Sequence, residues 1–116
     1  MIIIAATLDF ADQATCDTVL AESAPIQKAT RDDEPGCYAY CFAPDPCVTG
    51  RIQVYELWED SDTLAAHFRH PNYIAMRDLI RSHQPTGAAN RAYLVERDEP
   101  VYGPNGEYRD AFFADN

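Results

Sequence analysis

The sequence predicts an α+β fold of the ferredoxin-like type, with four antiparallel strands and helices on one face of the sheet. Four short runs of β-branched, aromatic or small apolar residues are typical of strands. Segments with helical spacing of apolar residues separate the first run from the second and the third from the fourth, which gives the order β-α-β-β-α-β. A chain of 116 residues, 47% of them apolar, suits one domain with one core.

The first half of the chain supplies two strands and a long helix. Residues 2–8 are β-branched and apolar, as in a buried strand. Apolar residues follow helical spacing over 12–31, where Pro25 is expected to kink the helix or split it in two. The DDEPG turn at 32–36 ends this helix, and residues 37–43 form the second predicted strand.

The second half repeats the pattern with a shorter, interrupted helix. Residues 51–59 are predicted to be the third strand and residues 91–97 the fourth. Between them, Asp60 and Ser61 are good N-caps for a helix that pauses at His70-Pro71 and then resumes.

The strands indicate a second layer on the face that the helices leave open. Residues 2–6 and 37–42 are apolar in both registers, whereas a strand with one wet face alternates polar and apolar residues. Two helices cover only one face of such a sheet. We therefore expect a homodimer that packs sheet against sheet as a dimeric α/β barrel.

The last residues are expected to form an extension to this domain. We assign residues 1–99 to the ferredoxin-like domain and residues 100–116 to an aromatic C-terminal extension. The extension has Gly-Pro and Asn-Gly turns, and we expect it to pack across the dimer because its aromatic side chains would otherwise be exposed. These side chains are Tyr102, Tyr108, Phe112 and Phe113.

Charge narrows the choice of partners. Nineteen acidic and nine basic residues give a formal net charge of −10. Such a chain repels phosphate backbones and anionic lipids, so we expect neither nucleic acid nor a membrane as a partner. The apolar start MIIIAATL has no basic leader and reaches Asp9 quickly, which predicts a cytoplasmic protein.

The four cysteines are expected to be reduced thiols. Cys37 and Cys41 lie in one predicted strand, where four residues span roughly 13 Å, too far for a disulfide or a shared metal. No C-x-x-C motif occurs in the sequence.

Four short motifs, in order, resemble the antibiotic biosynthesis monooxygenase family. They are EPGC at 34–37, E-x-W-E at 56–59, L-x-A-H at 64–67 and PN-x-x-A at 71–75. The family consists of dimeric α+β barrels that include quinol monooxygenases, polyketide anthrone oxygenases and members with no known reaction. The resemblance runs from residue 2 to about residue 97, and implies a cofactor-independent oxygenase acting on a quinol or a related phenolic or polyketide aromatic.

Without a cofactor, the substrate itself must supply electrons to dioxygen after it loses a proton. His67 is the best candidate base by residue type, with Trp58 beside it as the second catalytic candidate. A phenol of pKa about 10 facing an imidazole of about 6.5 leaves a gap of roughly 5 kcal/mol, which the pocket must close by stabilising the phenolate. The expected substrate-binding residues are Glu56, Phe68, Tyr73, Met76, Arg77 and Arg91.

Plainer interpretations remain open for each of these residues. His67 can also be interpreted as a core histidine with satisfied nitrogens. With His70 and Glu59 it could in principle hold a metal, although we expect none. Glu56 either orients a histidine or, as we favour, pairs with an arginine across the sheet. The rival functions are a non-catalytic dimer that binds a small aromatic metabolite and a haem-degrading monooxygenase. Haem-degrading monooxygenases that this chain resembles are expected to have an asparagine on the first strand, but the first strand here reads IIIAATL.

Overall fold

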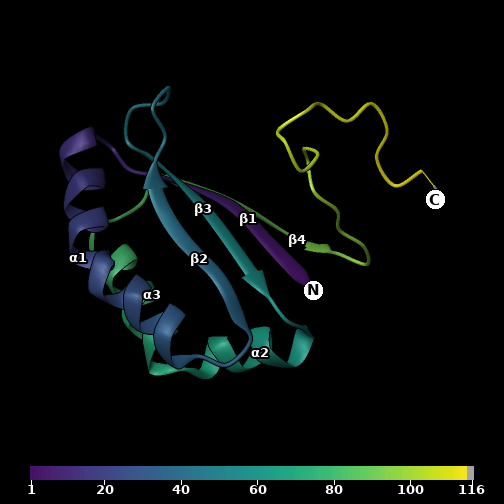
Figure 1. The fold of residues 1–116 in the computed structure, drawn as a ribbon. Coiled ribbons are helices and arrows are strands. Elements are labelled where there is room, and N and C mark those ends of the chain that lie inside the picture. Colours follow the sequence, from purple (N-terminus) through teal and green to yellow (C-terminus); the bar gives the residue numbers. More distant parts are fainter. Residues whose placement is uncertain (115–116) are drawn as a thin grey trace.

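The computed structural model describes residues 1–114 and contains a four-stranded antiparallel sheet with three helices on one side (Figure 1). This confirms the predicted ferredoxin-like plan, with the second helical region divided in two. No described helix is both long and apolar enough to cross a bilayer. The elements are β1 (Ile2–Asp9), α1 (Gln13–Asp33), β2 (Cys37–Pro44), β3 (Arg51–Trp58), α2 (Ser61–Arg69), α3 (Pro71–Ser82) and β4 (Gly87–Leu94).

The strands lie in the order β2-β3-β1-β4. The predicted fourth strand, 91–97, was placed too late, since β4 begins at Gly87 and ends at Leu94. Its first residues, GAAN, belong to types that are depleted in strands, so local sequence did not reveal them. These residues are in the sheet because they pair with β1, where Asp9 lies opposite Gly87.

Helix α1 is continuous, so of the two expected outcomes at Pro25, a kink or a split, the split is wrong. A proline removes the amide that would bond to the carbonyl four residues earlier, here that of Ala21. Ala21 and Pro25 are both exposed, so water can bond to this carbonyl. The Asp12 side chain caps the N-terminus by accepting from the Thr15 amide.

The break between α2 and α3 falls where the sequence predicts it. Asp60 caps α2 in a reciprocal capping box with Thr63. Pro71 occupies the start of α3, where its missing amide costs no helical hydrogen bond. His70 caps α3 with its ring, because Nδ1 accepts from the Asn72 amide at 3.0 Å.

The core lies between the helices and one face of the sheet. Alternate residues of β3 point into it, and all four are buried: Ile52, Val54, Glu56 and Trp58. The core has two clusters. The apolar cluster consists of Phe10, Cys16, Val19, Ile52 and Val54. The aromatic cluster consists of Tyr40, Trp58 and Met76.

No described helix covers the opposite face of the sheet (Figure 1). One cross-strand row on this face runs through Cys41, Tyr55, Ala5 and Arg91. Tyr55 is 45% exposed in the single chain, and all of β4 apart from Gly87 is exposed. A broad apolar surface is thus left without cover within the described chain.

The chain after β4 folds back on itself, away from α1 (Figure 1). The Glu99 carboxylate accepts from the Phe113 amide at 2.6 Å and lies 3.3 Å from the Arg109 guanidinium. Arg97 and Arg109 lie over the rings of Phe113 and Phe112 respectively. Tyr108 is nevertheless 89% exposed. The predicted extension also included residues 115–116, which lie outside the described residues.

Candidate functional site

His67 lies on the sheet-facing side of α2 and is only 2% exposed. Its ring is surrounded by four aromatic side chains. The ring centroids of Trp58 and Tyr73 are 4.6 and 5.4 Å away, and those of Tyr40 and Phe68 are 5.5 and 5.8 Å away. The imidazole therefore sits within an aromatic shell at the junction of β2, β3, α2 and α3.

Glu34 is the polar partner of this imidazole, and sequence reasoning missed it. It follows α1 as the C-cap residue, and it is buried. Its Oε1 lies 2.7 Å from His67 Nδ1, while its Oε2 accepts from Asn72 Nδ2 at 3.2 Å. The EPGC motif was the available signal, because it places a carboxylate directly after the end of the predicted first helix.

Two opposing effects act on the pKa of His67. Burial lowers it, because the imidazolium loses its hydration. The hydrogen bond to Glu34 and the charge of that carboxylate act against burial but do not cancel it. His67 is therefore neutral around pH 7, as a proton acceptor must be.

The expected pairing of Glu56 with an arginine across the sheet is wrong, because Glu56 bonds to Trp58. Trp58 Nε1 donates to Glu56 Oε1 at 2.9 Å, and both side chains are buried. Burial raises the pKa of Glu56 to about 7, and the negative charge of Glu34 adds to this increase, while the indole hydrogen bond opposes it. The end of β3 thus holds a carboxyl group that titrates near neutrality.

Three further residues that we expected at the site lie beside His67 or Trp58. Tyr73 and Phe68 pack edge to face with ring centroids 5.0 Å apart. Phe68 is 51% exposed and therefore lies at the outer margin of the aromatic shell. Met76 is buried against Trp58 in the aromatic cluster.

The two arginines lie apart from this group. Arg77 bonds to its neighbour Asp78, at 3.1 Å from Nη2 to Oδ1. Arg91 pairs with Ala5 on the uncovered face, opposite to the face that holds Trp58. In the single chain, Arg91 and His67 are thus on opposite sides of the sheet.

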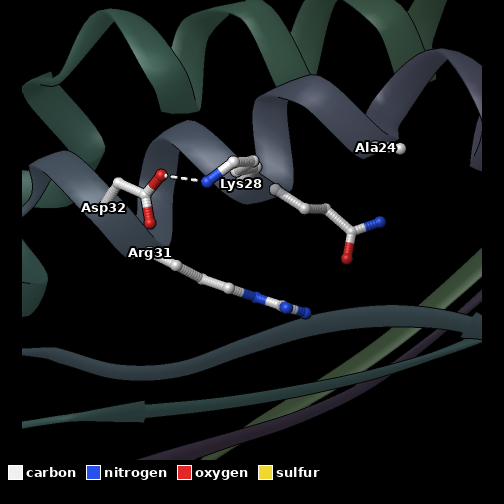
Figure 2. Close-up of a pocket in the computed structure, with 5 residues that line it drawn as sticks. Ala24, Lys28, Arg31 and Asp32 are labelled. Atoms are coloured by element: carbon white, nitrogen blue, oxygen red, sulfur yellow. Dashed lines mark hydrogen bonds and ion pairs between the residues drawn. The ribbon is translucent and has the colours of Figure 1, made fainter.

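A cavity of about 400 Å³ lies along α1, beside the β2 edge (Figure 2). Its polar side chains already have partners. Lys28 pairs with Asp32 at 2.6 Å, and Arg31 donates to the Tyr40 carbonyl. Gln27 accepts from the Phe42 amide. These bonds cover the free edge of β2, so we assign this cavity a structural role.

The metal site considered for His67, His70 and Glu59 is not formed within residues 1–114. No three His, Cys, Asp or Glu side chains of that part converge closely enough to hold an ion. His70 Nδ1 instead accepts from the Asn72 amide.

Comparison with known proteins agrees with this geometry. The model of the antibiotic biosynthesis monooxygenase family matches residues 1–79. No curated protein sequence matches the chain. A crystal structure described as an antibiotic biosynthesis monooxygenase shares 26% identity, with a TM-score of 0.70, over 84% of this chain and all of that chain.

Two further solved structures have the same fold at lower identity. A Deinococcus radiodurans protein described with the same family name superimposes with a TM-score of 0.78 at 22% identity, covering 89% of this chain and 100% of its own. SnoaB, a cofactor-independent oxygenase from Streptomyces nogalater, gives a TM-score of 0.63 at 12% identity, covering 85% of this chain and 96% of its own.

Proposed function

Because the chain belongs to the antibiotic biosynthesis monooxygenase family, we propose that it oxidises a quinol or a related electron-rich phenolic or polyketide aromatic with dioxygen, without a metal or organic cofactor. One observation supports this most. A buried imidazole, His67, is held by a buried carboxylate inside an aromatic shell. A flat aromatic substrate fits such walls, and a neutral imidazole can take its proton.

The proposed reaction starts with proton transfer to His67 and then uses the substrate as the electron donor. The substrate anion gives one electron to dioxygen, and the resulting radical and superoxide combine into a peroxide. The imidazolium returns its proton to that peroxide. For a ring CH2 group, loss of the remaining hydrogen with cleavage of the O–O bond gives C=O and water, so each oxygen atom and electron is accounted for.

We place the substrate at the outer side of the shell, against Phe68 and Tyr73. These two rings are the more exposed walls, whereas Trp58 and Tyr40 are enclosed. A lowered pKa of His67 widens the proton-transfer gap to a phenol. The site must therefore bind the phenolate much more tightly than the phenol.

We also propose that the protein acts as a homodimer, with the uncovered sheet faces packed together and the C-terminal extension lying across the partner. Exposed apolar side chains on that face and on β4 support this, including Tyr55 and Tyr93. Light scattering at micromolar concentration should give twice the mass of one chain. A folded 13.0 kDa species at that concentration would overturn the dimer.

A cytoplasmic location is part of this proposal. The structure has four free cysteines and no disulfide among residues 1–114, and Cys47 is exposed. Free thiols suit a reducing compartment.

The burial of His67 favours a second candidate, a non-catalytic protein that binds a small aromatic molecule. In that case the imidazole only joins α2 to the end of α1.

Oxygen consumption tests the proposed function. Reduced naphthoquinones, benzoquinols and anthrones are supplied to the purified protein in an oxygen electrode cell, with the same concentration of boiled protein as the control. Protein-dependent uptake together with oxygenated product supports the enzyme. Saturable binding of these compounds without uptake indicates the binder, and a Soret shift with haemin followed by haem loss would indicate haem degradation.

A further inference from the structure

We infer that Glu34 is the positioning residue for His67: it holds the proton on Nδ1, leaves the lone pair of Nε2 for the substrate, and stabilises the imidazolium that forms when the substrate is deprotonated. The base role of His67 belongs to the proposed function, and the inference about Glu34 rests on it. The tautomer of His67 can be measured independently of any reaction.

The ring nitrogen is assigned by the partners of the carboxylate. Glu34 Oε1 lies 2.7 Å from His67 Nδ1, and Oε2 accepts from Asn72 Nδ2. An ionised carboxylate has only acceptor atoms, so the nitrogen that meets it must be the one that bears hydrogen. Both oxygens of Glu34 are then satisfied, and the neutral imidazole has its hydrogen on Nδ1.

The carboxylate is held from three elements at once. Glu34 ends α1, His67 belongs to α2, and Asn72 lies in the first turn of α3. The backbone of Asn72 is itself held, because its backbone N–H donates to His70 Nδ1. Glu34 is also only 6% exposed. Its position, and with it the plane of the His67 ring, is therefore determined by packing as well as by the bond between them.

The other nitrogen of His67 has no competing partner. Within residues 1–114, Nε2 makes no hydrogen bond, whereas Nδ1 bonds to Glu34. The rings nearest to the imidazole are aromatic, and Phe68 and Tyr73 form the wall that reaches the surface. A substrate hydroxyl that enters along this wall would meet Nε2.

The charge of Glu34 acts in the direction that a base requires. Burial opposes protonation of His67, and the carboxylate partly restores it. The other titratable groups that face this site are His70 and Cys37 beside Glu34, the phenols of Tyr40 and Tyr73, and Glu56 behind Trp58. Among the groups that bond to the His67 ring in the described chain, Glu34 alone carries a negative charge.

The first measurement is ¹⁵N NMR of the histidine rings in the wild-type protein. At pH 8, we expect His67 to show a protonated Nδ1 and an unprotonated Nε2. The opposite tautomer would overturn the inference. This measurement needs no substrate and no variant, so it remains decisive even if a variant does not fold.

The second measurement compares Glu34→Gln with Glu34→Asp. We expect E34Q to lower the pKa of His67 in the NMR titration and to reduce kcat roughly 10- to 100-fold at unchanged KM, as loss of an orienting carboxylate does elsewhere. E34D keeps the charge and should recover part of the rate and of the titration. Unchanged ¹⁵N shifts and an unchanged titration in E34Q would refute the positioning role.

Glu22→Gln is the matched control. Glu22 lies within α1 and, like Glu34, faces a histidine, with 3.4 Å between its Oε2 and His83 Nε2. This pair is partly exposed and does not include His67. We expect E22Q to leave both kcat and the His67 spectrum unchanged. If the wild-type tautomer is as expected but no quinol or anthrone is oxidised, the proposed function fails while the assignment of Nδ1 stands.

Discussion

The two clusters of the core are built from different kinds of residues. The apolar cluster around Val19 and Ile52 has no ionisable group other than the Cys16 thiol. The aromatic cluster around Trp58 adjoins three buried ionisable side chains, those of Glu34, Glu56 and His67. Burying such groups costs free energy unless each finds a partner. Each of the three has one, and they nevertheless add less stability than apolar side chains of the same size would. We therefore assign stability mainly to the apolar cluster and chemistry to the aromatic one.

Truncation of the apolar cluster should have the largest effect on folding. Ile52 is fully buried on β3. We expect Ile52→Ala to lower the free energy of unfolding by about 2–5 kcal/mol, because it removes buried methyl groups and leaves a cavity. Urea unfolding at pH 7 measures this loss. The NMR titration of His67 in the folded variant should be unchanged, and a loss below about 1 kcal/mol would contradict the assignment.

The aromatic cluster should instead show a pH-dependent stability that originates at Glu56. Its pKa is raised from 4.5 to about 7 in the folded protein, so folding retains a proton that the unfolded chain releases. The contribution of Glu56 is fully present below pH 4.5 and is lost as the pH rises towards 7. The loss amounts to at most about 3.5 kcal/mol at ~1.4 kcal/mol per pKa unit.

Glu56→Gln is the variant that isolates this loss, because glutamine keeps the size of the side chain and an oxygen that can accept from Trp58. We expect the difference in unfolding free energy between E56Q and wild type to grow in favour of E56Q from pH 4.5 to 7 and to level off above. Urea unfolding at several pH values measures it. Parallel pH profiles for the two proteins would show that Glu56 does not titrate in this range.

The C-terminal extension should affect neither cluster and should have the smallest effect on folding of the single chain. Its aromatic side chains are largely exposed, including Tyr108 and Phe112. We expect deletion after Pro100 to weaken self-association about tenfold, equivalent to ~1.4 kcal/mol. Sedimentation equilibrium of the truncated and full-length proteins measures this. Identical association and melting would mean that the extension does not pack on a partner.

The fold was largely predictable because its signals are local. Strand patterns, the cap at Asp60 and the break at Pro71 each depend on neighbouring residues, and the structure confirms them. The start of β4 was missed because pairing with β1, not local propensity, places Gly87 in the sheet. Long-range pairing is not visible in a single sequence.

The candidate site was predictable by residue type but not by partner. The motif placed His67 near Trp58, whereas the bond from His67 to Glu34 spans 33 positions, with β2 and β3 between them. Arg91 was chosen for its charge alone, and the register with Ala5 puts it on the other face. A histidine and an arginine were the partners considered for Glu56, but its indole partner lies two residues away on the same strand, where alternation places both side chains on one face.

The most direct test of the division between the two clusters is His67→Asn, measured for both rate and stability. The asparagine Nδ2 can still donate to Glu34 in place of the ring nitrogen, but the side chain has no equivalent of Nε2. His83→Asn, at the end of α3, is the matched control. We expect H67N to lose ~100-fold or more in quinol oxidation, as for loss of a general base, while its unfolding free energy stays within about 1 kcal/mol of wild type. Full activity in H67N, or a loss of activity that only follows unfolding, would contradict a chemical role for the aromatic cluster.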